Sequence, residues 1–127
     1  MGQKVHPNGL RLGIINGWQS NWFAERGYEN SLHEDLRIRD FIKQKAFHAG
    51  ISRIVIERRA EKMSVNIHTA RPGILIGKRG ADADALRREV AEMTGNEVFI
   101  NIREIRKAEV DPQLIAENIA LQLERRV

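Results

Sequence analysis

Residues 71–80 read RPGILIGKRG, and this stretch decides both the predicted fold and the predicted site. Its Arg-Pro-Gly start breaks the preceding strand pattern, its Ile-Leu-Ile centre makes a short apolar turn, and a helix is expected from Ala81. Glycines let a backbone come close to a sugar-phosphate chain, and amides at a helix start face an anion. Two cations between the glycines can neutralise phosphate. We therefore predict that Gly77, Lys78, Arg79 and Gly80 form a phosphate clamp.

The Gly-x-x-Gly pattern is weak evidence by itself, because about 0.8 such pairs are expected by chance in a chain with ten glycines. A tight corner between two helices, with Lys78 and Arg79 merely exposed to solvent, is the structural alternative. A nucleotide P-loop is rejected: residues 73–79 hold one residue too few between the glycines, and Arg79 stands where Ser or Thr would bind magnesium. A clamp of the predicted design grips a nucleotide backbone in KH-type modules.

Apolar spacing on both sides of this loop predicts an α+β chain. The expected elements are a helix over 31–50, strands over 51–59 and 63–68, a short helix over 74–76, a helix over 81–94, a strand over 98–103 and a helix over 112–127. A capping box of Ser31 and Glu34 should open the first helix, and Asp111 should cap the last. The first two strands should pair as an antiparallel hairpin through residues 60–61.

Residues 1–30 look irregular, because glycines interrupt them too often for a long helix or strand. They nevertheless carry apolar side chains that must be covered, so we expect an arm that docks and not a free tail. Trp18, Trp22 and Phe23 could stack on bases, and anchoring the arm against the domain explains them equally well.

Composition limits the classes of function. The 127 residues contain 42% apolar and 30% charged side chains and no cysteine, so a core is expected and a disulfide or thiolate site is excluded. Residues 51–80 hold seven Lys and Arg against two Glu, although the whole chain carries only +4. This excess indicates an anion-binding face or ordinary surface charge. The four histidines have no metal-ligand spacing, and no nucleophile–base set is visible, so we predict no metal, no cofactor and no enzyme.

Five segments together resemble the bacterial-type small-subunit ribosomal proteins of the S-three family. They are MGQKVHPNGLRLGI (1–14), SRIVIER (52–58), IHTARPGILIGK (67–78), NIREIRK (101–107) and QLERRV (122–127). The resemblance implies a type II KH domain, a three-stranded mixed sheet packed on helices, with an irregular N-terminal arm. It divides the chain into an arm (1–30), a KH domain (31–110) and the start of a C-terminal helix (111–127) leading to a second domain that is absent.

The resemblance also implies the function and the partners. The chain would be a structural component of the head of the small ribosomal subunit, bound to 16S-class ribosomal RNA near the mRNA entry path. The expected RNA contacts are Gly77, Lys78, Arg79 and Gly80 in the loop, Arg71 beside it, and Lys4 and Arg11 on the arm.

Ribosomal proteins of the S-ten and S-fourteen families are the expected protein neighbours, and mRNA is a further candidate partner. No membrane partner is expected, since no apolar run approaches the roughly 20 residues of a membrane span. No small-molecule substrate is expected either. The expected location is the cytoplasmic ribosome, with an organelle ribosome as the alternative. The alternative function is a free KH-type regulator or chaperone of RNA outside the ribosome. The family's mRNA-unwinding residues lie downstream of Val127, so that activity is not carried over.

Overall fold

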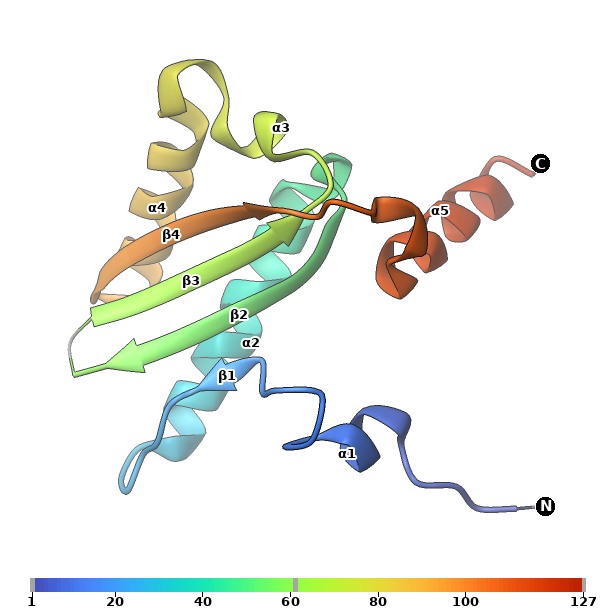
Figure 1. Ribbon diagram of the computed structural model, residues 1–127. Coiled ribbons are helices and arrows are strands. Elements are labelled where there is room, and N and C mark those ends of the chain that lie inside the picture. Colours follow the sequence, from blue (N-terminus) through green and yellow to red (C-terminus); the bar gives the residue numbers. More distant parts are fainter. Residues whose placement is uncertain (1, 61, 127) are drawn as a thin grey trace.

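The protein is described by a computed structural model that covers residues 2–60 and 62–126 (Figure 1). The elements in chain order are α1 (Pro7–Arg11), β1 (Ser20–Asn21), α2 (Tyr28–Lys45), η1 (Phe47–Ala49), β2 (Ile51–Arg59), β3 (Lys62–Thr69), α3 (Pro72–Ile76), η2 (Lys78–Gly80), α4 (Ala81–Thr94), β4 (Glu97–Glu104), η3 (Ala108–Val110) and α5 (Pro112–Glu124). The predicted α+β class is therefore confirmed.

The sheet is mixed and has the order β1-β2-β3-β4. The predicted hairpin is confirmed: β2 and β3 pair antiparallel, and β4 then pairs parallel to β3. Four strands are present where three were expected, because Ser20 and Asn21 of the arm pair parallel to Ile56 and Glu57 at the outer edge of β2. A two-residue strand has no alternation to detect in a sequence, so only the tertiary pairing reveals it.

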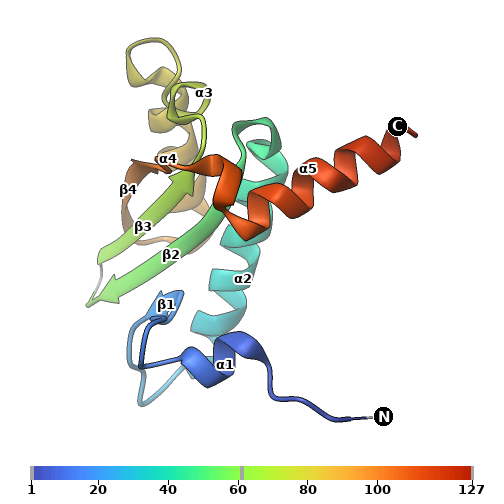
Figure 2. The same cartoon turned by 45° about the vertical axis from the view of Figure 1, so that its right-hand side comes forward.

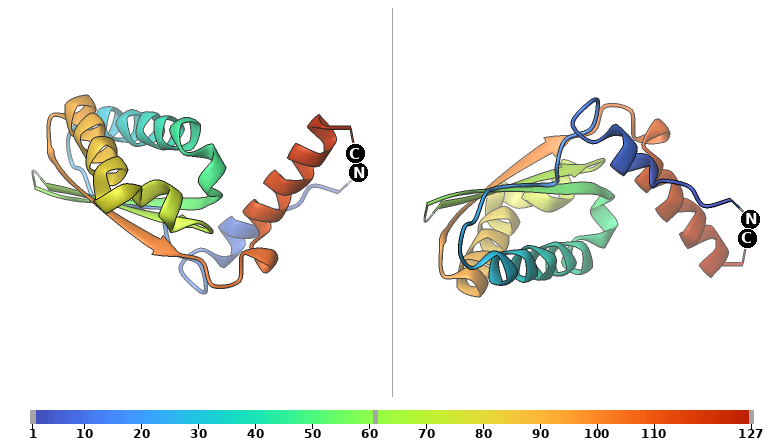
Figure 3. Two further views of the ribbon diagram at one scale, coloured as in Figure 1. Left: turned by 90° about the horizontal axis from the view of Figure 1, so that it is seen from above. Right: turned by 90° about the horizontal axis from the view of Figure 1, so that it is seen from below.

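One face of the sheet carries the helices, and the other is open. In Figure 3, α2 and α4 lie on the same side of the sheet. Figure 1 looks onto the opposite face, and no helix lies in front of β2, β3 or β4. The core between the two layers consists of the inward side chains of the strands and helices: Ile38, Ile42, Ala46, Ala49, Ile51, Ile54, Ile56, Met63, Val65, Ile67, Leu75, Leu86, Val90 and Val98. Alternation in β3 thus separates a buried apolar row from an outward polar row.

The start of α2 differs from the expectation. The helix begins at Tyr28, with Gly27 as its N-cap in the left-handed region at φ +73°. Ser31 already lies inside the helix, because its backbone N–H donates to the Gly27 carbonyl at 3.1 Å. The predicted capping box of Ser31 and Glu34 is therefore wrong. Gly27, which needs no side chain to enter the helix, takes that place instead.

The other helix ends agree better with the sequence. Gly95 ends α4 with a left-handed residue, and Asp111 caps α5 by accepting from the backbone N–H groups of Gln113 and Leu114. The last helix ends at Glu124, short of the expected end at Val127. Val127 and Glu61, which the predictions included, lie outside the described residues.

Some residues of the predicted apolar stripes do not reach the core. Leu36 on α2 and Met93 on α4 are exposed, although each fits the helical spacing of its neighbours. Among the helices of residues 2–60 and 62–126, none combines the length and apolar character needed to cross a bilayer.

Candidate nucleic-acid interface

The glycine loop (residues 77–80) forms a sharp bend between α3 and α4. Gly77 ends α3 at φ +70° and ψ −166°, a combination that is open almost only to glycine. Arg79 and Gly80 follow in the left-handed region, at φ +55° and +77°. The predicted arrangement of a short helix, a glycine-bounded bend and a second helix is therefore present.

The two glycines have different surroundings. A Cβ atom at Gly77 would lie 2.8 Å from the Cβ and 2.6 Å from the Cγ of Asp82, so the first turn of α4 packs closely against this residue. A Cβ at Gly80 would meet nothing within 4 Å. Gly77 thus serves internal packing, and only the backbone at Gly80 is open to close approach from outside.

The charges near the loop have both signs. Lys78 and Arg79 are exposed, and neither forms an ion pair with another described residue. Gly80 offers no side chain to cap α4, while Asp82 and Asp84 lie in its first turn. Because the Asp82 side chain lies against Gly77, an anion should meet less repulsion on the Gly80 side of the bend.

Hydrogen bonds fix the backbone of Arg71, the residue that directly precedes α3. Its N–H donates to the Ala49 carbonyl at 3.1 Å and lies 3.3 Å from the hydroxyl of Thr69. Thr69 is fully buried and donates to the same Ala49 carbonyl at 2.6 Å. This network ties the end of β3 to η1 and sets the direction of α3, while the Arg71 side chain stays exposed. The sequence did not reveal this role of Thr69, because the face of the sheet on which its side chain lies depends on the strand pairing.

The apolar residues of α3 divide between core and surface. Leu75 is buried, whereas Ile74 and Ile76 are 47% and 40% exposed next to the glycine loop. Two of the three are therefore exposed and could touch a base, and only Leu75 belongs to the core.

The predicted contacts Lys4 and Arg11 lie apart from the glycine loop. Arg11 is the last residue of α1, and Lys4 precedes that helix; both are exposed. In Figures 1 and 2, α1 and the α3–α4 corner lie at opposite ends of the molecule. The structure therefore separates the predicted residues into a loop set and an arm set.

The arm docks through a short central segment, as expected. The Ile56 N–H donates to the Gln19 carbonyl at 2.8 Å beside the β1–β2 pairing. The fully buried Asp35 carboxylate accepts from the Trp22 indole at 2.6 Å and the Ser20 hydroxyl at 3.0 Å. Arg58 completes this hub with a hydrogen bond of 3.0 Å from Nε to Asp35. Trp22 thus anchors the arm to α2. Arg58, one of the seven cations of residues 51–80, is bound to a carboxylate inside the protein.

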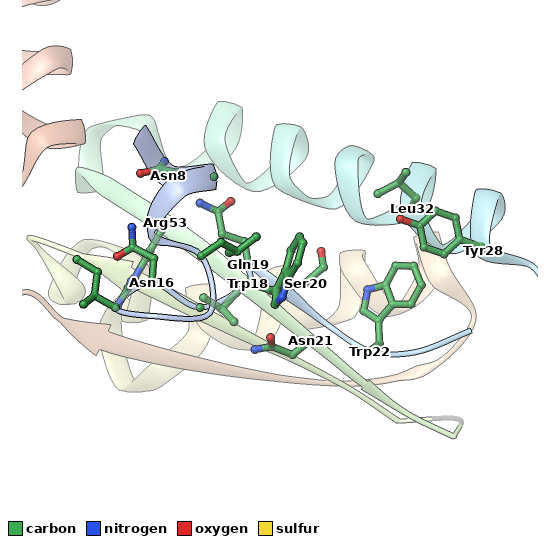
Figure 4. A pocket seen from close by; sticks show the side chains of 15 residues that line it. Asn8, Asn16, Trp18, Gln19, Ser20, Asn21, Trp22, Tyr28, Leu32 and Arg53 are labelled. Carbon is green, nitrogen blue, oxygen red and sulfur yellow. The ribbon is translucent and has the colours of Figure 1, made fainter. Parts of the chain in front are cut away.

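A groove of about 1090 Å³ lies between the arm, β2 and the start of α2. Figure 4 shows arm residues, among them Trp18 and Trp22, along it, with Tyr28 from α2 and Arg53 from β2. The rings of Trp22 and Tyr28 have centroids 5.3 Å apart. Trp18 and Phe23 are 66% and 87% exposed, so these two keep the alternative role of stacking on a base.

No cluster of three or more His, Asp or Glu side chains that could hold a metal ion occurs in the part of the chain that the structure describes. The residues of the loop, the arm and the groove offer hydrogen-bond donors, cations and aromatic surfaces.

Comparison with known proteins agrees with this geometry. Residues 37–110 match the KH domain family. The chain is 59% identical over all 127 residues to "Small ribosomal subunit protein uS3" of Myxococcus xanthus, covering 58% of that protein. The proteins of the same name from Anaeromyxobacter dehalogenans (strain 2CP-1) and Geobacter sulfurreducens are 58% and 55% identical over the full chain, which covers 57% and 60% of them.

The chain thus spans a little under three fifths of the length of several curated relatives that it matches. The family match runs from the middle of α2 to the end of η3, and so includes β2, β3, α3, the glycine loop, α4 and β4. The chain therefore belongs to the KH domain family, and its resemblance to the small-subunit ribosomal proteins of the S-three family is confirmed along its whole length.

Proposed function

We propose that this chain is a structural, non-enzymatic RNA-binding component of the head of the small ribosomal subunit, near the mRNA entry path. The observation that carries the proposal is the glycine loop at the α3–α4 corner of a KH domain, with two exposed cations between its glycines. The relatives are all named as small ribosomal subunit proteins, and this supplies the ribosomal context.

In the proposed mechanism, the glycine loop holds the backbone of 16S-class ribosomal RNA. The open space at Gly80 admits a phosphate to the backbone, and Lys78 and Arg79 replace its counterions. Ile74 and Ile76, both exposed on α3 next to the glycine loop, offer apolar surface for an adjacent base. Arg71 adds a cation at the start of α3.

The arm makes a second contact in this proposal. Lys4 and Arg11 lie on the exposed part of the arm, ahead of the segment that docks on β2, and so can follow an RNA strand away from the domain. Proteins of the S-ten and S-fourteen families and mRNA remain the proposed further partners. The division into an arm (1–30), a KH domain (31–110) and the start of a C-terminal helix (111–127) is part of the same proposal.

The test is RNA binding by a loop variant, Lys78→Gln with Arg79→Gln, measured against a transcript of the head region of 16S-class ribosomal RNA. Each phosphate neutralised on a single strand adds roughly 0.7 to the slope of log affinity against log salt, so loss of the phosphate contact that the two cations share should flatten that slope by about 0.7. The matched control is Arg26→Gln with Arg37→Gln, exposed cations before and on α2 with the same change in charge. An unchanged affinity and slope in a folded loop variant would overturn the clamp.

A second measurement separates the ribosomal role from that of a free KH regulator. The chain should sediment with small subunits through a high-salt wash, because a structural component is held at many points on its surface. Association that occurs only at low salt contradicts the ribosomal role and favours the free module.

A further inference from the structure

Three basic residues form a row across the open face of the sheet. Arg53 on β2 pairs in register with His68 on β3, which pairs in register with Arg103 on β4. Each is flanked along its strand by a buried or half-buried isoleucine, so all three belong to the face opposite the helices that Figure 1 shows. Neighbouring strands are about 4.8 Å apart, so the two arginine Cα atoms lie about 10 Å apart. We call these three residues the basic row.

Unlike the arginines on the helix side, the arginines of the basic row have no partner among the residues that the structure describes. Arg58 is bound to Asp35, and the Arg39 guanidinium donates to the Gln19 and Ile54 carbonyls and the Ser20 hydroxyl. Arg53 and Arg103 are exposed and form no ion pair with any residue of 2–60 and 62–126. Fold stability therefore does not explain their presence on this face.

The local positive potential is poorly balanced. Burial, and then the charges of Arg53 and Arg103, lower the pKa of His68, and only Asp111 acts in the opposite direction. The Asp111 carboxylate is already engaged, since it accepts from the Ser52 hydroxyl at 2.8 Å and from the first amides of α5. An external anion would relieve the repulsion within the row.

We propose that the basic row binds a backbone phosphate of RNA and forms a further RNA contact, separate from those of the glycine loop and the arm. The occupant follows from charge complementarity: two unpaired guanidiniums present forked donors that suit phosphate oxygens. This inference rests on the proposed function only for the identity of the nucleic acid.

The surroundings of the basic row suit a single RNA strand. Two residues before His68 and Arg103 on the same face, the Asn101 amide donates to the Asn66 side chain at 3.1 Å. The pair can offer its remaining donors and acceptors to a base or ribose. Phe99 is exposed one further step along β4 and provides a surface for stacking. Arg53 also lines the arm groove in Figure 4, so the row reaches the arm at this end.

The test compares four forms of the full 127-residue chain on the same 16S-class transcript: wild type, a row variant (Arg53→Gln with Arg103→Gln), the loop variant and the Arg26→Gln/Arg37→Gln control. Loss of the one phosphate contact should flatten the salt slope of the row variant by about 0.7, so that between 50 and 200 mM salt its affinity falls about 2.6-fold less than that of wild type. The NMR signals of His68 should shift on addition of RNA in the wild type. Unfolding midpoints check that every variant is folded.

The outcomes separate the two proposals. A row variant with wild-type affinity and slope, beside a weakened loop variant, overturns the basic row and leaves the clamp standing. A weakened row variant beside an unchanged loop variant supports the row and overturns the clamp. If the control weakens as much as the row variant, general charge explains binding and the row is overturned. Binding of a poly-glutamate peptide with an affinity equal to that for RNA also overturns the assignment to RNA.

Discussion

Replacement of Gly77 by alanine tests the part of the glycine loop that is needed for packing. Gly77 has φ +70° and ψ −166°, and a Cβ there would lie 2.8 Å from the Cβ of Asp82. The Asp82 carboxylate can rotate away, but its Cβ is fixed to the backbone of α4. The added methyl group must therefore displace the loop relative to the helix.

Two costs contribute to the expected loss of stability. A side chain in a backbone region reserved for glycine costs about 1–3 kcal/mol. Overpacking of a close contact typically adds about 1–3 kcal/mol. We therefore expect Gly77→Ala to lower the free energy of unfolding by roughly 2–6 kcal/mol, a large part of the 5–15 kcal/mol typical of a domain. Gly80→Ala, with open space around its Cβ, should cost only the left-handed conformation, about 1–2 kcal/mol.

The assay is urea unfolding followed by circular dichroism, with Gly77→Ala and Gly80→Ala each made in the wild type and in an Asp82→Gly background. Removal of the Asp82 side chain should recover about 1–3 kcal/mol for the first substitution and none for the second. Equal costs for Gly77→Ala in both backgrounds would refute the steric part of this reasoning. A cost no greater than that of Gly80→Ala would refute all of it.

Two further predictions concern the arm and the open face. Trp22→Phe removes the indole donor to the buried Asp35 carboxylate and should lower the free energy of unfolding by about 1.5–3 kcal/mol, with faster proteolysis of the arm. Trp18→Phe, at an exposed position, is the control. Equal stability of both variants would contradict the anchoring role. Burial, Arg53 and Arg103 keep the pKa of His68 below its ordinary value, so between that value of about 6.5 and the lower native one the unfolded chain binds more protons. The free energy of unfolding should therefore fall as the pH drops through this window, and His68→Gln should make this decrease smaller. Urea titrations from pH 7.5 to 5 measure the free energy of unfolding. An unchanged pH dependence in the variant would contradict the prediction.

Local patterns predicted the regular parts of the fold well. Alternation in residues 63–68 and 98–103 correctly identified two strands and the side chains that face the helices. Asp111 and Gly95 act where their residue types predicted, because a cap depends on a few neighbouring backbone groups. Such features depend on interactions within one turn or one strand, so one sequence suffices to find them.

Features that depend on distant contacts escaped the sequence reasoning. The pairing of β1 and the Asp35 hub join the arm to α2 and β2, which are separated from it by up to about 40 residues along the chain. Ser31 had the right residue type for a cap, but Gly27 offered an earlier helix start that does not need a side chain. In each case a tertiary contact or a backbone conformation outweighed the local signal.

The candidate site shows the same division. The glycine loop and its two cations could be predicted, because the motif is continuous in the sequence. The different surroundings of Gly77 and Gly80 could not, since they depend on how the first turn of α4 packs. The basic row combines residues 53, 68 and 103, which only the strand register brings together.

The most direct measurement of the central claim is ultraviolet crosslinking of the chain to small-subunit ribosomal RNA, with the attached peptides mapped to single residues by mass spectrometry. We expect crosslinked nucleotides on residues 77–80, and on Arg71 or Ile74 beside them. Efficient crosslinks confined to other surfaces, with residues 71–80 free of attached nucleotide, would contradict the phosphate clamp.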